Sequence, residues 1–202
     1  MQKLEWLYQQ HPEEYNIVGN LGTAYELAGN IPRAIEFLKK AIELNPQSHY
    51  GSEWIHLKVL EEKAKAIPQF RNIIQLNNEN NFARWLFADS PSDEKMKELK
   101  KQLFYQLKER ISFVPAPDAA VGQLLMDLGD LEQKSGDKNI AKQYYEKAIE
   151  YAPALIPVIN ERQHISRIKL FYYHYQGLLI TGFIILLLVA LYFILIRKKN
   201  NS

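Results

Sequence analysis

The chain has 202 residues and a formal net charge of +2, from 25 basic and 23 acidic residues, and it contains no cysteine. Disulfides, thiolate metal sites and cysteine nucleophiles are therefore excluded. The tail residues Arg197, Lys198 and Lys199 account for the positive sign, because without them 22 basic and 23 acidic residues remain, a net charge of −1. A nucleic-acid surface needs a clustered basic excess, so the composition predicts no nucleic-acid partner.

Most prolines lie between segments that have helical periodicity, and alternating strands joined by Asn-Gly or Asp-Gly turns are not evident. This pattern predicts an all-α fold. The amino-terminal segment is polar, with Lys3, Glu5 and His11 and no apolar run of seven residues. We therefore expect no signal peptide in this chain.

Two segments share one spacing of small, apolar and proline residues. In both, the first glycine is followed by a second glycine after seven positions and by an alanine after twelve, and a later alanine is followed by proline after five. Two unrelated helices would not share all of these intervals. The first segment has Leu21, Gly22, Tyr25, Gly29, Ala34, Leu38, Ala41 and Pro46, and the second has Leu128, Gly129, Glu132, Gly136, Ala141, Tyr145, Ala148 and Pro153.

This spacing resembles that of the tetratricopeptide repeat, a helix-turn-helix unit of about 34 residues with an L-G-x-x-Y, A-x-x-x-F and closing P signature. The resemblance implies a right-handed solenoid of helix pairs, in which the first helices line a concave groove for a peptide or helix of a partner protein. Two positions depart from the pattern, since Glu132 stands in place of an aromatic residue and Leu38 in place of Phe.

On the first helix of the clearer unit, the resemblance implies that Asn16, Asn20, Thr23 and Glu26 face this groove. Asn20 matches one asparagine of a clamp with which some relatives grip a carboxy-terminal carboxylate. The lysines and arginine that complete such a clamp are not found at the corresponding places, so that ligand is not predicted. The alternative for these residues is plain exposure to solvent.

The repeat register continues upstream of the first unit. Counting back one period from Leu38 and Pro46 gives Leu4 and Pro12, within a helix of which the chain holds only the second half. One hypothesis is that the chain is an amino-terminally shortened form of a longer protein, which would also hold the missing first helix and a signal sequence. The alternative is a half-repeat that packs on its neighbour.

Residues 1–66 are predicted to be repeat-like, with a further first helix over 48–66. The register then fails, because Gly22 maps to His56 and Ala34 to Pro68. Residues 67–92 are rich in asparagine and interrupted by proline, which predicts a long irregular insertion. Its aromatic cluster either folds back onto the array or forms an exposed docking element; the cluster consists of Phe82, Trp85, Leu86 and Phe87.

Residues 93–153 are predicted to hold a helix and the second repeat unit. Ser92 is expected to cap a helix that ends before Pro115. The two helices of the second unit are expected over 118–135 and 138–151. The apolar face of the capped helix is formed by Met96, Leu99, Leu103, Leu107 and Ile111.

Residues 154–176 are predicted to form a juxtamembrane helix that leads into a transmembrane helix from Gly177 to Ile196. These twenty residues carry no charge and no proline, and as a helix they reach ~30 Å, the thickness of the hydrocarbon core of a bilayer. The basic tail, residues 197–202, ends the apolar segment. Aromatic residues that favour the headgroup region precede it, namely Phe171, Tyr172, Tyr173 and Tyr175. The alternative is a buried core helix.

No arrangement of residues predicts chemistry. His49, Glu53 and His56 share a helix face, but the two histidines are ~10 Å apart along the axis, too far to bind one metal ion together. Sequences typical of a nucleophile elbow, a zinc protease or a phosphate loop do not occur. The sequence therefore predicts no catalytic residue, metal ion, cofactor or small-molecule substrate.

The favoured interpretation is a non-catalytic, single-pass membrane scaffold that binds a partner protein and holds it at the lipid bilayer. The alternative is an accessory subunit of a membrane enzyme or secretion complex, held there by its transmembrane helix. The repeats are expected in the cytoplasm if Met1 is the true start, and outside it if a signal sequence is missing. Positive charges do not decide the orientation, because three of them flank each end of the apolar segment.

Overall fold

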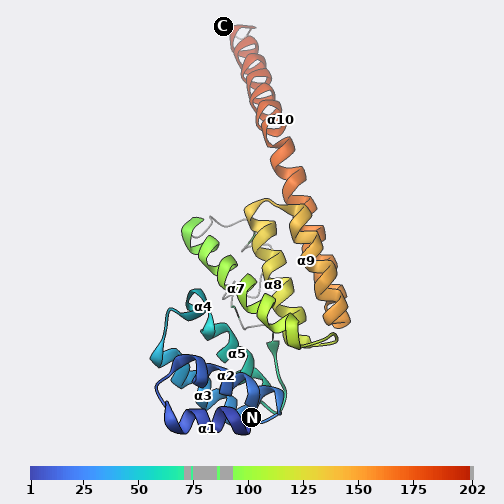
Figure 1. The fold of residues 1–202 in the computed structure, drawn as a ribbon. Helices are drawn as coiled ribbons and strands as arrows, with labels where there is room; N and C mark the ends of the chain where they lie inside the picture. The colour runs from blue at the N-terminus through green and yellow to red at the C-terminus, as the bar shows by residue number, and fades with distance from the viewer. Residues whose placement is uncertain (71–73, 75–85, 87–92, 201–202) are drawn as a thin grey trace. The chain divides into compact units, whose positions relative to one another are not determined.

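The computed structural model describes residues 1–70, 74, 86 and 93–200 of the chain. Regular structure in these residues is helical, without any strand, so the predicted all-α fold is confirmed. Two compact units make up the chain, Met1–Ile159 and Asn160–Ser202 (Figure 1).

The first repeat-like pair consists of helices α2 (Tyr15–Leu27) and α3 (Ile31–Leu44). A left-handed Gly29 with φ of 76° ends α2, and the Asn30 side chain accepts a hydrogen bond from the Arg33 amide to begin α3. Glycine takes this backbone conformation without strain, which explains its place in the turn. The core of this pair contains Val18, Leu21, Tyr25, Ala34, Phe37, Leu38, Ala41 and, from the next helix, Leu60.

A short amino-terminal helix, α1 (Gln2–Gln10), lies on this core through Leu4 and Tyr8. The Tyr8 ring meets Phe37 edge to face at 5.1 Å, and its hydroxyl accepts a hydrogen bond from Lys40. Helix α1 therefore packs on the α2–α3 pair that follows it. Trp6 remains 60% exposed.

The second repeat-like pair is formed by α8 (Ala119–Ser135) and α9 (Lys138–Tyr151). Asp118 caps α8 and Asp137 caps α9, each accepting a hydrogen bond from an amide three residues later. The two helices pack closely because Gly122 and Gly129 of α8 lie directly against α9. Their bounds agree with the predicted ranges 118–135 and 138–151.

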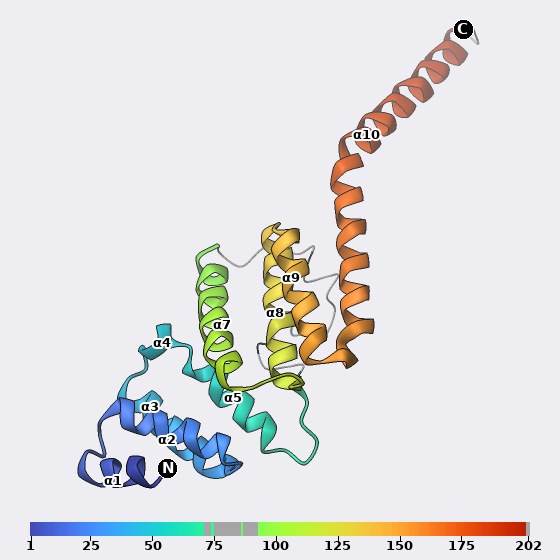
Figure 2. The ribbon, with the colours of Figure 1, turned by 45° about the vertical axis from the view of Figure 1, so that its right-hand side comes forward.

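Between the two pairs lie α5 (Glu53–Lys63) and α7 (Asp93–Phe113), which come from either side of residues 67–92. Helix α3 packs on α5, α5 on α7, and α7 on α8, so α5 and α7 take the place of a middle pair in the array (Figure 2). Ile74 and Leu86 are buried. The predicted cap Ser92 and the aromatic residues Phe82, Trp85 and Phe87 lie outside the described residues.

The predicted continuous helix over 48–66 is wrong. A short helical turn, α4 (Ser48–Gly51), precedes α5, and the chain bends within α4, where His49 and Tyr50 have φ of 52° and 60°. Such left-handed residues other than glycine cost about 1–3 kcal/mol each and persist only where their surroundings hold them. The His49 ring stacks on Tyr105 of α7 at 4.8 Å, and Tyr50 meets the same ring edge to face. Helical periodicity cannot reveal such a contact between distant segments.

The second unit is almost entirely helical. Helix α10 (Ile156–Asn200) begins in the first unit, close to the expected start at Val158, and continues past Ile196 through the basic residues Arg197, Lys198 and Lys199. By length and composition, Pro153–Leu191 is a candidate membrane span, and its apolar window is not buried. This lack of burial distinguishes it from the core helix of a soluble domain.

Candidate functional site

A cavity of about 320 Å³ lies among α2, α5 and α7 of the first unit. Three of the residues predicted to face the groove line it: Asn16 and Asn20 are exposed, and Thr23 is half-buried. The other residues in the walls are Tyr15, Gly19, Leu38, His49, Glu53, His56, Gln106, Glu109, Arg110 and Phe113. The cavity therefore joins the predicted groove helix to α5, which lies within the further first helix expected over 48–66, and to α7, which the repeat pattern did not connect with it.

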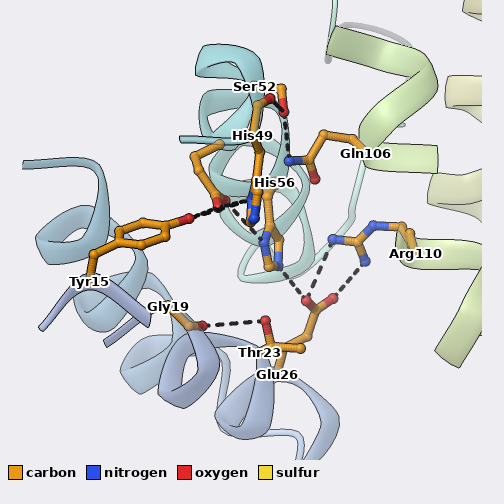
Figure 3. A network of polar contacts seen from close by, with 10 residues as sticks. Tyr15, Gly19, Thr23, Glu26, His49, Ser52, His56, Gln106 and Arg110 are labelled. Atoms are coloured by element: carbon orange, nitrogen blue, oxygen red, sulfur yellow. Dashed lines mark hydrogen bonds and ion pairs between the residues drawn. The ribbon is translucent and has the colours of Figure 1, made fainter. Parts of the chain in front are cut away.

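Glu26, the fourth residue predicted to face the groove, is buried instead. Its side chain is 3% exposed and meets Arg110 at 2.8 Å, His56 at 2.6 Å and Lys63 at 2.9 Å. Figure 3 shows its carboxylate turned toward His56 of α5 and Arg110 of α7. The family resemblance implied that Glu26 faces the groove, but these three partners hold its carboxylate away from the cavity, so Glu26 joins three helices and is not presented to a partner.

Two opposing effects set the pKa of the Glu26 carboxyl. Burial alone would raise the pKa, but the hydrogen bond with His56 and the positive charge of Arg110 outweigh burial and hold it well below its ordinary value. Glu26 is therefore charged at neutral pH, and its charge is matched by the guanidinium that shares both of its oxygens.

A second carboxylate, Glu53, organises the other side of the cavity. The Tyr15 hydroxyl donates a hydrogen bond to it at 2.8 Å, and His49 Nδ1 lies 2.6 Å from the same oxygen. The second oxygen lies 3.8 Å from His56 Nδ1, so the His56 ring stands between Glu53 and Glu26. Burial opposes ionisation of Glu53, but hydrogen bonds with the two histidines and Tyr15 lower its pKa below the ordinary value.

The bend at α4 is what places His49 in this network. Its left-handed backbone directs the ring into the cavity wall, where the hydrogen bond with Glu53 raises the pKa of the imidazole above its ordinary value. The Ser52 hydroxyl donates to the carbonyl of His49 and accepts from Gln106 of α7. The sequence showed His49, Glu53 and His56 on one helix face, but the partners of Glu53 and His56 on α2, Tyr15 and Glu26, are 38 and 30 residues away in the chain. Within the described residues no group of three or more such side chains could hold a metal ion.

The second repeat unit does not offer a matching open surface. The positions that correspond to Asn16, Asn20 and Thr23 by the 107-residue offset between Gly22 and Gly129 are also polar, but each of them is buried. They are Gln123, Asp127 and Asp130. Gln123 donates a hydrogen bond to Asp127, and Asp130 accepts one from Tyr145. Of these two repeat units, the α2–α3 pair is therefore the one whose groove positions are accessible to a partner.

Stability of the first unit should be greatest in mildly acidic solution. Glu26 and Glu53 have depressed folded-state pKa values, so the stability that they contribute above their unfolded-state pKa of about 4.3 is lost as the pH falls. His49 has a raised pKa, so its contribution is present below about 6.5 and is lost as the pH rises through its folded-state value. We expect urea midpoints, measured by tryptophan fluorescence from pH 4 to 8, to peak between about 5 and 6.5.

The variant His49→Gln is the control for this profile. It should reduce the decline in the urea midpoint above pH 6.5 while leaving the acidic decline in place, because the carboxylates remain. A wild-type midpoint that still rises from pH 7 to 8 would contradict the assignment of a raised pKa to His49.

Comparison with known proteins agrees with this arrangement. The family model of the tetratricopeptide repeat matches residues 18–48 and again residues 122–155, which lie on the α2–α3 and α8–α9 pairs. No curated protein matches the chain. The two matches fall on the two segments whose spacing was counted in the sequence and on the two closely packed helix pairs of the structure. The chain therefore contains tetratricopeptide repeats at residues 18–48 and 122–155.

Proposed function

We propose that this protein is a non-catalytic scaffold that binds a partner protein in the cavity of its first repeat unit and holds it at a membrane. The repeats support a protein–protein interaction scaffold in general terms. The single observation that carries the specific site is the cavity of about 320 Å³, which opens beside exposed amide side chains at the groove positions of α2.

The network below the cavity supports this proposal because it makes the walls rigid. Glu26 connects α2 with α5 and α7, and Glu53 connects α5 with Tyr15 of α2. A preformed surface binds with a smaller loss of conformational entropy than one that must be ordered by its partner. Asn16 and Asn20 lie outside this network, so their amides can be removed without disturbing it.

The double variant Asn16→Ala/Asn20→Ala should therefore fold normally and lose its partner. Affinity purification of the full chain from detergent extracts of its own cells should recover a stoichiometric protein with the wild type and at least tenfold less with the variant. The control is Asn139→Ala, an exposed asparagine at the start of α9, which should retain the partner. Equal recovery with all three proteins would count against the site.

The membrane part of the proposal concerns residues 177–196. These residues lie within an apolar helix of sufficient length, whose apolar window is not buried, and such a helix spans a bilayer with all of its backbone groups bonded. Exchange of 177–196 for an unrelated apolar helix should keep the protein in the membrane fraction and keep the partner. Loss of the partner on exchange would favour an accessory subunit whose transmembrane helix makes the contact.

A further inference from the structure

We propose that the cavity among α2, α5 and α7 receives a basic side chain, arginine or lysine, from the partner segment. This inference rests on the proposed function and concerns the chemistry of the same site. It follows from the charges of the residues in and near the cavity walls, where the cations are paired with carboxylates and one glutamate is not paired.

The fixed cations near the cavity are already matched by buried carboxylates. Arg110 is 2% exposed and places both terminal nitrogens on Glu26, and Lys63 lies 2.9 Å from the same carboxylate. When His49 is protonated, its charge faces Glu53 at 2.6 Å. Lys63 also lies 4.0 Å from Asp118. Arg110, Lys63 and protonated His49 are therefore balanced by Glu26, Glu53 and Asp118, and none of these cations is available to an incoming anion.

Glu109 is the exception among the described wall residues. It lies on the cavity side of α7, is exposed, and makes no ion pair with any residue in the described ranges. It is close enough to His49 to help raise the pKa of that imidazole, which places its charge near the mouth of the site. The unmatched charge of the wall is therefore negative.

The remaining exposed groups also suit a donor-rich ligand. Asn16, Asn20 and Thr23 line the cavity. The Asn16 amide nitrogen already donates to Glu14 and the Thr23 hydroxyl to the Gly19 carbonyl, so the oxygens of these two side chains remain as hydrogen-bond acceptors, and an arginine or lysine side chain carries only donors. Tyr15 and Phe113 add aromatic surface to the walls, against which a guanidinium or ammonium group is favourably placed. A guanidinium can satisfy Glu109 with two hydrogen bonds and still reach an amide oxygen.

An acidic ligand fits poorly at the same place. A carboxylate entering the cavity would approach Glu109 and would have to separate Arg110 from Glu26 to find a cation. Breaking such a buried pair leaves an uncompensated charge, which is strongly unfavourable. The chemistry of the walls therefore selects a basic segment over an acidic one.

The test uses the full chain in detergent micelles and a random-peptide display library. Enriched peptides should share an arginine or lysine, and replacing that residue with glutamine should weaken binding to the wild type about tenfold. In Glu109→Gln the same replacement should change affinity by less than about twofold, because the charge that the basic residue recognises is gone. Glu94→Gln, an exposed glutamate on α7 outside the cavity, should behave like the wild type.

Two results would overturn the inference while leaving the proposed function intact. One is enrichment of peptides with acidic side chains or free carboxylates that bind the wild type but not Asn16→Ala/Asn20→Ala. The other is an equal preference for arginine over glutamine in the wild type and in Glu109→Gln. Enriched peptides that bind the wild type and the double asparagine variant equally would overturn both the inference and the proposed site.

Discussion

Replacing Arg110 with methionine should lower the free energy of unfolding of the first unit by about 3 kcal/mol. The guanidinium is almost completely buried and donates to both oxygens of Glu26, across 84 residues of sequence. Its removal leaves a buried carboxylate with fewer cations, and removal of one partner from such a pair costs about 3–5 kcal/mol. We expect the lower end of this range because Lys63 and His56 still contact Glu26.

The measurement is urea unfolding of the full chain in detergent micelles, followed by tryptophan fluorescence. Trp54 reports directly on the interface, because its indole nitrogen donates to Gln102 of α7. The matched control is Lys58→Met on α5, which breaks an exposed ion pair with Glu61 and should cost less than about 0.5 kcal/mol. Two variants of equal stability would mean that the buried pair contributes no more than the exposed one.

The double variant Glu26→Met/Arg110→Met separates the buried charge from the loss of packing. The double variant removes the Glu26 carboxylate and the Arg110 guanidinium together, so neither is left buried without the other. It should therefore lose less stability than the sum of the losses of the two single variants. A coupling energy of about 2 kcal/mol is expected from a double-mutant cycle on residues in direct contact. Simple additivity would show that Glu26 and Arg110 act independently.

The sequence predicted the helix pairs well because their signals are local. Glycine at the end of a first helix, a capping residue and small residues at fixed intervals all lie within one unit of about 34 residues. The α2–α3 and α8–α9 pairs, and the end of α7 before Pro115, follow from such signals. The bend at His49 and Tyr50 does not, because its left-handed backbone is held by Tyr105, more than fifty residues away.

Only part of the candidate site could be predicted from the sequence. The resemblance to the repeat family implied that Asn16, Asn20 and Thr23 face a groove, and these three residues line the cavity. The sequence could not show that Glu26 is buried in an ion pair with Arg110. Residues 67–92 interrupt the repeat spacing, so the position of α7 relative to α2 could not be obtained by counting repeat periods. The sequence offered one signal for this ion pair: an acidic residue, Glu26, at a groove position, and an arginine, Arg110, on a helix whose register was unknown.

Gly22 and Gly129 occupy the same position in the two repeats, but they do not tolerate substitution by alanine equally. A β-carbon at Gly129 would lie 2.7 and 2.8 Å from ring carbons of Tyr145 and 3.3 Å from the Ala141 carbonyl oxygen. At Gly22 the nearest atoms, the Leu38 nitrogen and the Ala34 oxygen, are at 3.4 and 3.5 Å. The difference arises because α9 carries tyrosine where α3 carries leucine.

Gly129→Ala should therefore destabilise the first unit by about 2 kcal/mol, whereas Gly22→Ala should stay within about 1 kcal/mol of the wild type. Tyr145 cannot move aside easily, because it is 1% exposed and its hydroxyl donates to Asp130 at 2.8 Å. The gain in helix propensity from glycine to alanine, up to about 1 kcal/mol, acts in both variants and favours neither. Urea unfolding of the two variants side by side measures the difference.

A compensating change tests the cause. In Gly129→Ala/Tyr145→Leu, the α8–α9 pair acquires the leucine that the α2–α3 pair has at Leu38, which frees the space that the new methyl group needs. The double variant should lose less stability than the two single changes added together, although Tyr145→Leu alone removes the hydrogen bond to Asp130. Equal losses for Gly22→Ala and Gly129→Ala would show that the tyrosine ring yields, and that close packing of α8 on α9 does not depend on glycine at this position.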